Sequence, residues 1–282
     1  MNDLLPETLR HRSSSELARQ RFVAVERAPT FLCEWRRVLF AHYEVEPSLL
    51  QREVPFELEL FEGKAVASLV AFTMRRFRPH WGGELTKWLF LPAATNHFFN
   101  VRTYVRHHDE PGVYFMTQWL SHPLCLLGRL PGLRLPWRWG QMAYQHAHET
   151  GHLTGQVVGN RGTRLTYSAT LALNPVFVPS AAGSMADFAM ERYTAIALRG
   201  SHEVIFRVWH EPWPQCPIQI QVKDACLLPQ TGDWHRHACL AGANYTLGCK
   251  EVWLGRARRI HSGRARRLRT SRSVLRAFYD LP

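Results

Sequence analysis

Polar and apolar side chains alternate along residues 100–106, and this run constrains the fold more than any other part of the chain. Successive side chains of a strand point to opposite faces, so Asn100, Arg102 and Tyr104 share one face and the residues between them share the other. A polar face can point to solvent, as in an ordinary half-buried strand, or into the polar interior of a barrel. The turn predicted at 109–112 would pair this strand with residues 113–120.

The rest of the chain reads as a series of short strands with turns between them. A further hairpin is expected around residues 62–64, and another around 159–162. The strongest helix prediction covers residues 184–195, with Ser184 as the capping residue and Asp187 in the first turn. Many strands and few helices predict a mainly β protein, either an antiparallel barrel or a sandwich. The expected strands are 31–40, 65–75, 98–107, 113–120, 155–158, 164–173, 204–209, 218–227 and 249–254.

The distribution of charge predicts a nearly neutral body with a basic tail. The chain has 282 residues and a formal net charge of +12, and residues 256–282 hold nine arginines against one acid. We expect one domain over residues 28–255, a partly disordered extension over 1–27 with a weak helical stretch at 15–22, and a separate tail over 256–282. The tail is interpreted as a solvated appendage, with binding to nucleic acid or anionic lipid as the alternative.

Cysteine use and hydropathy predict a soluble cytoplasmic protein. The six cysteines form no Cys-x-x-Cys pair, and the first residues contain no apolar signal core. No apolar run reaches the length of a membrane span. The sequence leaves self-association open.

Motifs for metals and nucleotide cofactors find no support. Residues 148–152 match the zinc-protease pattern His-Glu-x-x-His, but Gly151 and Gly155 make a poor helix, so we expect a loop and no metal. The chain has no phosphate-binding loop, no dinucleotide fingerprint and no nucleophile elbow. We therefore expect no cofactor.

The remaining candidates for a binding site lie on one strand face, at one helix end and at one strand end. If Arg102 points inward, it needs an acidic partner or an anionic ligand, because an unpaired buried charge is costly. Glu191 is the natural partner, and the two could form a structural ion pair or leave the guanidinium available to bind a carboxylate. The candidate ligand-binding residues are Asn100, Arg102, Tyr104, Glu191, Arg192, Tyr193, His210 and Trp213.

These residues also carry a resemblance to a known family. The chain resembles domain of unknown function 2071 over roughly residues 30–255. The motifs that carry the resemblance are residues 35–79, Asn100-Val101-Arg102-Thr103-Tyr104-Val105, residues 111–115, Glu191-Arg192-Tyr193 and His210-Glu211-Pro212-Trp213-Pro214. That family is grouped by fold with acetoacetate decarboxylase, which implies a closed, mainly antiparallel β-barrel with a central pocket and a few peripheral helices.

The resemblance also shows what this chain lacks. Acetoacetate decarboxylase uses a lysine Schiff base with a second lysine beside it. The similar segment here, residues 135–139, contains no lysine, and Phe98 stands where relatives usually carry a glutamate. Decarboxylation by this route is therefore not expected.

Three functional hypotheses follow. The first is a barrel that holds a small organic acid or similar anion in a central pocket. The second is an enzyme acting on a keto acid or related carboxylate, with Glu191 or His210 as the acid–base group. The third is a structural body whose basic tail binds nucleic acid or lipid.

Overall fold

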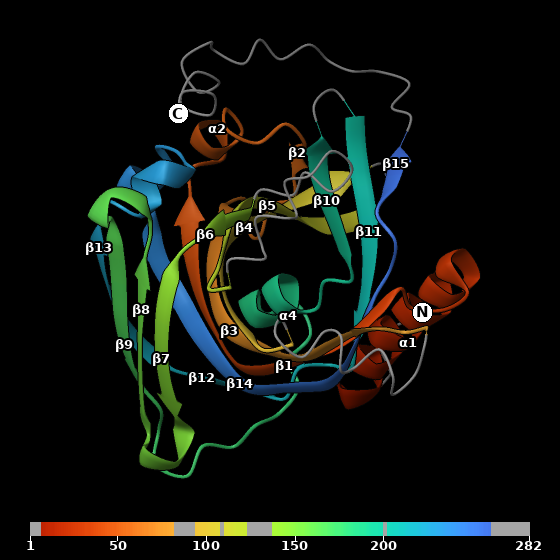
Figure 1. The fold of residues 1–282 in the computed structure, drawn as a ribbon, viewed down its shortest axis with the longest axis horizontal. Helices are drawn as coiled ribbons and strands as arrows, with labels where there is room; N and C mark the ends of the chain where they lie inside the picture. Colours follow the sequence, from red (N-terminus) through yellow and green to blue (C-terminus); the bar gives the residue numbers. More distant parts are fainter. Residues whose placement is uncertain (1–6, 82–93, 108–109, 123–136, 200–201, 261–282) are drawn as a thin grey trace.

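The computed structural model describes residues 7–81, 94–107, 110–122, 137–199 and 202–260, and it is mainly β as predicted (Figure 1). Its strands are β1 (Phe31–Val45), β2 (Glu57–Leu58), β3 (Ala65–Pro79), β4 (Asn96–His107), β5 (Glu110–Leu120), β6 (Trp137–Trp139), β7 (Gln141–Ala147), β8 (His152–Val158), β9 (Arg164–Thr170), β10 (Thr194–Arg199), β11 (His202–His210), β12 (Gln215–Pro217), β13 (Gln219–Ala225), β14 (Cys239–Leu254) and β15 (Arg258–Ile260). The helices used below are α1 (Glu7–Glu26), α2 (Pro47–Leu50) and α4 (Met185–Met190).

The larger of two sheets curves until its strand pairings return to their starting point. Its order is β12-β14-β1-β3-β4-β5-β10-β11-β15, and β11 also pairs with β14. The returning pairs join residues 208–210 to residues 252–254. Most neighbours are antiparallel, but β10 runs parallel to β5. The pairings therefore form a ring in which β4 lies between β3 and β5.

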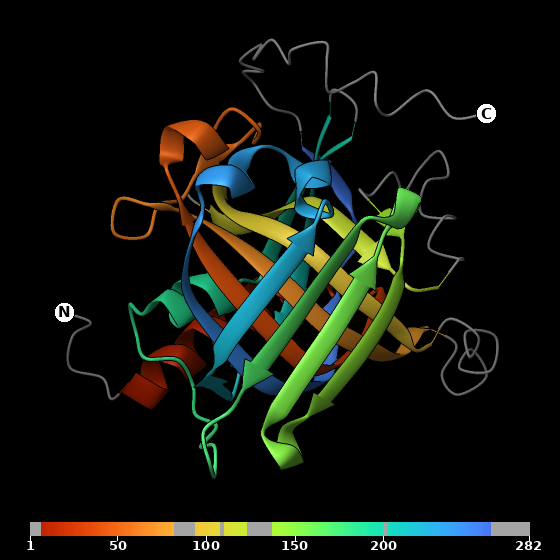
Figure 2. The same ribbon diagram turned by 90° about the vertical axis from the view of Figure 1, so that its left-hand side faces the viewer.

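A smaller four-stranded sheet, in the order β13-β9-β8-β7, covers the convex face of this ring (Figure 2). The two sheets share one hydrophobic core. From the large sheet this core takes Leu39, Leu69 and Phe99, and from the small sheet it takes Leu153 and Leu165. All are almost fully buried. Burying apolar area of this kind contributes about 25 cal/mol per Å², which is the main force holding the layers together.

The concave face of the ring wraps around α4, which lies inside the circle of strands (Figure 1). Ala186 and Met190 of the helix pack in one buried cluster with Phe40, Val70 and other residues of the sheet. The hydroxyl of Ser184 accepts a hydrogen bond from the backbone N–H of Asp187 at 3.2 Å, as the capping pattern predicted.

Helix α4 ends at Met190, earlier than the predicted 195. The carbonyl of Met190 accepts a hydrogen bond from the indole of Trp213, and that of Ala189 accepts one from Arg102. Side chains thus satisfy carbonyls that a longer helix would have paired internally. The residues after the helix lead directly into β10.

The N-terminal helix is longer than the predicted stretch at 15–22. It extends over Glu7–Glu26 and packs against the outside of β11. The hydroxyl of Ser15 donates to the carbonyl of His210 at 2.9 Å, and the indole of Trp209 donates to the carbonyl of Ser15 at 3.1 Å. The buried ring of Phe22 meets the edge of Trp253. These tertiary contacts stabilise a longer helix than its intrinsic helix propensity predicted.

The turn predicted at 109–112 is misplaced, because β5 already begins at Glu110. Pro111 pairs with Arg106 in the β4–β5 ladder, and Gly112 lies against the end of β10. A Cβ atom on Gly112 would come within 3.1 Å of the carbonyl of Thr194. Gly112 therefore lies at a close approach within the sheet rather than in a turn, and a Cβ atom there would push its neighbours aside by a few tenths of an ångström.

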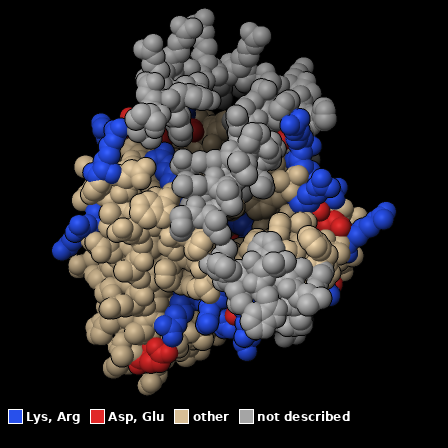
Figure 3. All heavy atoms as spheres, viewed as in Figure 1, with Lys and Arg blue, Asp and Glu red and all other residues tan. Residues whose placement is uncertain are grey.

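Several predicted features lie outside the described residues. These are residues 1–6 of the extension, residues 135 and 136 of the segment 135–139, and the tail from residue 261 onward. The described start of the tail forms β15, which pairs with β11. On the described part of the face in Figure 3, basic residues lie scattered rather than in one continuous patch. No helix in the described part of the chain is long and apolar enough to cross a membrane.

Candidate functional site

The polar face of β4 points into the ring, toward α4. Tyr104 belongs to a buried cluster with Ala189 of that helix, whereas Val101 and Val105 belong to the core between the two sheets. Asn100 and Tyr104 are both nearly inaccessible to solvent. The polar face of residues 100–106 therefore points into the ring of strands rather than to solvent.

Arg102 is the charged group at the centre of this interior. Its Nη2 atom donates a hydrogen bond to the carbonyl of Ala189 at 2.7 Å, near the negative end of the α4 dipole. The guanidinium carbon lies 5.2 Å from the ring centroid of Phe40 and 5.7 Å from that of Tyr104. The buried Nε atom has no hydrogen-bond partner among the described residues. One donor of this cation is therefore available.

Asn100 lies two residues from Arg102 on the same face and also has an unsatisfied atom. Its Oδ1 is buried and accepts no hydrogen bond from the residues that the structure describes. Buried polar groups are nearly always paired, so two unpaired atoms on one strand face are unusual. Together they provide one donor and one acceptor in the same interior.

Glu191 does not form the predicted ion pair with Arg102. Its Oε2 accepts a hydrogen bond from the hydroxyl of Tyr193 at 2.5 Å, and its Oε1 accepts one from the backbone N–H of Trp213 at 2.9 Å. Burial and this carboxylate raise the pKa of Tyr193 well above its usual value. The carboxylate therefore joins the end of α4 to the segment after β11.

His210 lies beside this group and is completely buried. Its ring contacts those of Tyr193 and Trp213 at centroid distances of 4.9 and 4.6 Å. Nδ1 lies 2.7 Å from the carbonyl of Glu211, so this nitrogen carries the proton and donates it. Burial lowers the pKa of His210 to about 4, and the ring is neutral at pH 7.

Arg192 is buried beside this interior, and its guanidinium carbon lies 5.5 Å from the ring centroid of Tyr104 and 4.5 Å from that of Phe188. Its Nη1 forms a 2.6 Å ion pair with Glu59, and its Nε donates to the carbonyl of Phe188 at 2.5 Å. Of the eight predicted residues, Asn100, Arg102 and Tyr104 therefore surround the end of α4. Glu191, Tyr193, His210 and Trp213 form an adjoining cluster, and Arg192 lies next to Tyr104, where it links Phe188 of the helix to Glu59.

Sequence reasoning missed two polar residues in the same interior, His42 and Ser68. The hydroxyl of Ser68 lies 2.8 Å from Nδ1 of His42 and 2.7 Å from the hydroxyl of Tyr104. Burial and the positive charge of Arg102 lower the pKa of His42 to about 3. Both lie in otherwise apolar strands, and a lone polar residue at an inward position was the signal that could have identified them.

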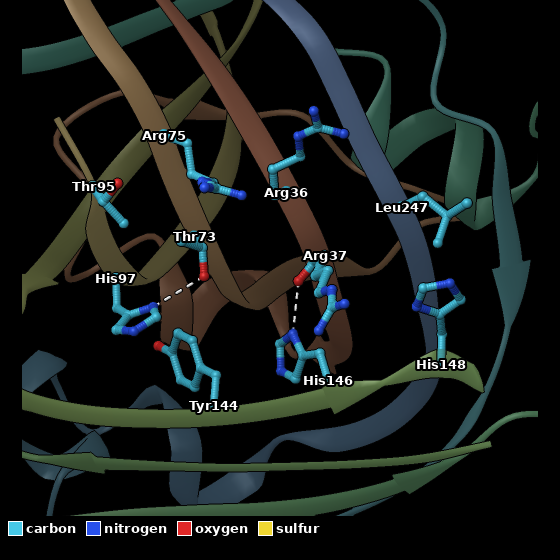
Figure 4. A pocket seen from close by; sticks show the side chains of 10 residues that line it. All are labelled: Arg36, Arg37, Thr73, Arg75, Thr95, His97, Tyr144, His146, His148 and Leu247. Atoms are coloured by element: carbon cyan, nitrogen blue, oxygen red, sulfur yellow. Dashed lines mark hydrogen bonds between the residues drawn. The ribbon is translucent and has the colours of Figure 1, made fainter. Parts of the chain in front are cut away.

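A cavity on the other face of the large sheet was also missed. It has a volume of about 720 Å³ and opens between the large sheet and β7 (Figure 4). We call it the cationic cleft, since three arginines and three histidines line it. Its lining residues are Arg36, Arg37, Thr73, Arg75, Thr95, His97, Tyr144, His146, His148 and Leu247. Two arginine doublets within strands, 36–37 and 75–76, were the available signal.

The His-Glu-x-x-His match forms no metal site. Residues 148–150 form one 3-10 turn between β7 and β8, and Gly151 follows with a φ of 74°. His152 already belongs to β8, so the two histidines do not share a helix face. No group of three metal-ligating side chains occurs within the described ranges.

Comparison with known proteins agrees with this architecture. The model of domain of unknown function 2071, described as an uncharacterized conserved protein, matches residues 33–238. The chain belongs to this family. A Bacillus subtilis member of similar sequence, the uncharacterized protein YqjF, is 27% identical over 183 residues, which cover 64% of this chain and 72% of that protein.

Solved structures similar to this member of the domain 2071 family are acetoacetate decarboxylase-like proteins. The enduracididine biosynthesis enzyme MppR, complexed with pyruvate, has a TM-score of 0.57 and 16% identity over 82% of this chain and 90% of its own. The acetoacetate decarboxylase of Legionella pneumophila has a TM-score of 0.58 and 12% identity, with coverages of 83% and 88%. An acetoacetate decarboxylase-like enzyme from Sphingomonas wittichii has a TM-score of 0.55 and 18% identity, with coverages of 83% and 94%. Likeness at these identities shows the fold alone.

Proposed function

We propose that the protein binds a small organic carboxylate inside the ring of strands, with Arg102 as the group that holds the negative charge. In this proposal the ring closed by β11 and β14 acts as a β-barrel around the ligand. The observation that carries the proposal is the buried, unpartnered Nε of Arg102 beside the unpartnered Oδ1 of Asn100. A carboxylate would accept from Nε, and a hydroxyl or amino group on the same ligand would donate to Oδ1.

The surroundings of Arg102 support a ligand rather than a protein partner for its charge. The described residues offer it a carbonyl and two aromatic faces but no carboxylate. Arg102 is partly buried, and a cation held there without an acidic partner is costly, so an anionic ligand would reduce that cost. MppR, which shares the fold, is solved with pyruvate bound, which is a ligand of the proposed class.

The same interior does not favour Schiff-base chemistry. The described lysines, Lys64, Lys223 and Lys250, are all exposed, while Lys87 lies outside the described residues. In the segment similar to the lysine loop of acetoacetate decarboxylase, the indole of Trp137 donates to Gln118 at 2.7 Å. Phe98 stacks on Phe72 with ring centroids 5.0 Å apart. Hydrophobic rings therefore occupy this part of the interior.

Glu191 and His210, the acid–base candidates, serve the proposed site by positioning it. Glu191 accepts hydrogen bonds from the hydroxyl of Tyr193 and the backbone N–H of Trp213, and His210 donates one to the carbonyl of Glu211. Their contacts fix the end of the helix whose carbonyl orients Arg102. We therefore propose ligand binding, without assigning these residues a chemical step.

Thermal unfolding in the presence of small carboxylates, with pyruvate as the first probe, tests the proposal. A ligand present at 100 times its Kd stabilises the folded state by about 2.7 kcal/mol, which corresponds to roughly 5–10 °C in Tm for a chain of this size. The Arg102→Lys variant keeps a positive donor for the carbonyl of Ala189 but has no nitrogen at the position of Nε and no planar guanidinium to bind a carboxylate. We expect this variant to fold and to lose most of the ligand-induced shift.

The matched control is Arg106→Gln, which changes an arginine of the same strand that pairs with Glu59 near the surface. This variant should keep the full shift. If Arg102→Lys responds to the carboxylates as strongly as the unmodified protein, Arg102 only caps α4 and the proposal is wrong. The proposal also fails if no carboxylate of the panel shifts the Tm of the unmodified protein.

A further inference from the structure

We propose that the cationic cleft is a second ligand site, separate from the interior around Arg102, and that it takes a planar aromatic carboxylate. The two sites lie on opposite faces of the same strands. Thr73 pairs with His97 in the β3–β4 ladder and both line the cleft, whereas their neighbours Phe72 and Phe98 belong to the interior cluster. The cleft volume of about 720 Å³ suits a small organic molecule.

The charges around the cleft favour an anion. Glu34 pairs with Arg36 at 2.8 Å and also with Arg76 at 2.9 Å, so one carboxylate serves two cations. Among the described residues, the ion pair of Arg37 is an exposed contact with Glu149 at 3.5 Å. The side chain of Arg75 is exposed and makes no hydrogen bond or ion pair with the residues that the structure describes. The arginines around the cleft therefore carry more positive charge than the described carboxylates beside them neutralise.

The backbone is bent in a way that brings these arginines to the cleft. Arg36 and Arg37 are neighbours in a strand and would ordinarily point to opposite faces, yet both line the cleft. The pairing of β1 with β3 shifts register between Arg36 and Leu39, and Arg37 adopts a left-handed φ of 53°. Arg76, next to Arg75, has a φ of 52°.

Such conformations are uncommon for residues other than glycine, and bulges that redirect a side chain are frequent at functional sites. Glycine would adopt the same backbone without strain, so the presence of arginine at position 37 calls for a role of its side chain. The bulge in β1 and the unpaired Arg75 are two independent observations that point to the same cleft.

The floor of the cleft is made of flat, uncharged rings (Figure 4). Tyr144 and His146 stack with centroids 5.2 Å apart, and His97 meets Tyr144 edge-on at 5.1 Å. Nδ1 of His146 donates to the carbonyl of Arg37 at 2.7 Å, so its Nε2 accepts from the hydroxyl of Tyr167. Burial lowers the pKa of both His97 and His146. A planar aromatic group fits these rings while its carboxylate reaches the arginines.

Calorimetric titration with three probes of defined chemistry tests the inference. The probes are 2-naphthoate, cyclohexanecarboxylate, which keeps the charge without a flat ring, and 2-naphthol, which keeps the ring and is uncharged at pH 7. We expect 2-naphthoate to bind at least tenfold more tightly than either of the others. We also expect Arg75→Gln to weaken its binding at least tenfold.

Two further variants give the controls. Arg164→Gln changes an exposed strand arginine outside the cleft and should leave the binding of 2-naphthoate unchanged. Arg102→Lys should also leave it unchanged, which separates this inference from the proposed interior site. The inference is overturned if 2-naphthoate does not bind, if Arg75→Gln binds it normally, or if Arg102→Lys abolishes its binding. Equal affinity for cyclohexanecarboxylate would overturn the aromatic part.

Discussion

At the scale of single residues, the interior depends on polar groups that satisfy one another within an apolar surrounding. Tyr104 is the clearest case, since its buried hydroxyl meets Ser68, which in turn meets His42. The alternation predicted that Tyr104 shares a face with Asn100 and Arg102, because period two is a property of the strand itself. The partners could not be predicted, because Ser68 and His42 come from strands whose register only tertiary packing determines.

Replacing Tyr104 with phenylalanine should therefore destabilise the protein by about 1–3 kcal/mol, because the hydroxyl of Ser68 loses a buried partner. Equilibrium unfolding in urea measures this difference. Tyr114→Phe on the neighbouring strand is the control, since the described residues offer its hydroxyl no hydrogen bond. Equal free energies of unfolding for the two variants would contradict this account of Tyr104.

At the scale of elements, strand existence was easier to predict than strand limits and helix length. The strands around residues 98–107 and 164–173 appear close to their predicted positions. Helix α4 ends early because side chains from distant segments cap its carbonyls, and such contacts leave no local pattern. The bulge that directs Arg36 and Arg37 to one cleft could not be predicted from the sequence either, because it arises from the pairing of β1 with β3.

The close approach of β14 to β1 beside the bulge can be tested at Gly248, which pairs with Arg36 and has a φ of 104°. A Cβ atom on Gly248 would lie 1.9 Å from the carbonyl oxygen of Trp35. We expect Gly248→Ala to destabilise the protein by at least about 3 kcal/mol, since backbone atoms cannot move aside easily. Thermal or urea unfolding measures the loss.

Gly242→Ala provides the matched control on the same strand. No atom lies within 4 Å of a Cβ built at Gly242, and its φ is not positive. This variant should change the free energy of unfolding by less than about 1 kcal/mol. Similar losses for both glycines would mean that the close approach of β14 to β1 at Gly248 does not require glycine.

At the scale of the whole molecule, three buried histidines couple folding to pH. Burial is the main cause that lowers the pKa of His42 to about 3 and the pKa values of His146 and His210 to about 4. In the unfolded chain these rings take up protons near pH 6.5, whereas in the folded protein they stay neutral until the pH falls further. Their contribution to stability is therefore complete at pH 7 and decreases as the pH falls below about 6.5.

We expect each histidine to remove up to about 1.4 kcal/mol of stability per pH unit, with the steepest loss near roughly pH 5. Urea unfolding at a series of pH values gives the slope, which equals the difference in bound protons between the unfolded and folded states. His210→Gln should reduce this slope by about one proton, whatever its effect on stability at pH 7. An unchanged slope would show that His210 is already protonated in the folded protein.

The pairing of β1 with β14 has a consequence for the synthesis of this protein. β1 is made early, but its pairing with β14, from Phe31 with Leu254 to Glu44 with Cys239, needs the last part of the body of the chain. A nascent chain that stops short of residue 239 leaves that edge of β1 unpaired, and unpaired edges with apolar neighbours promote aggregation. The ribosome must therefore deliver almost the entire domain before the first long strand is protected.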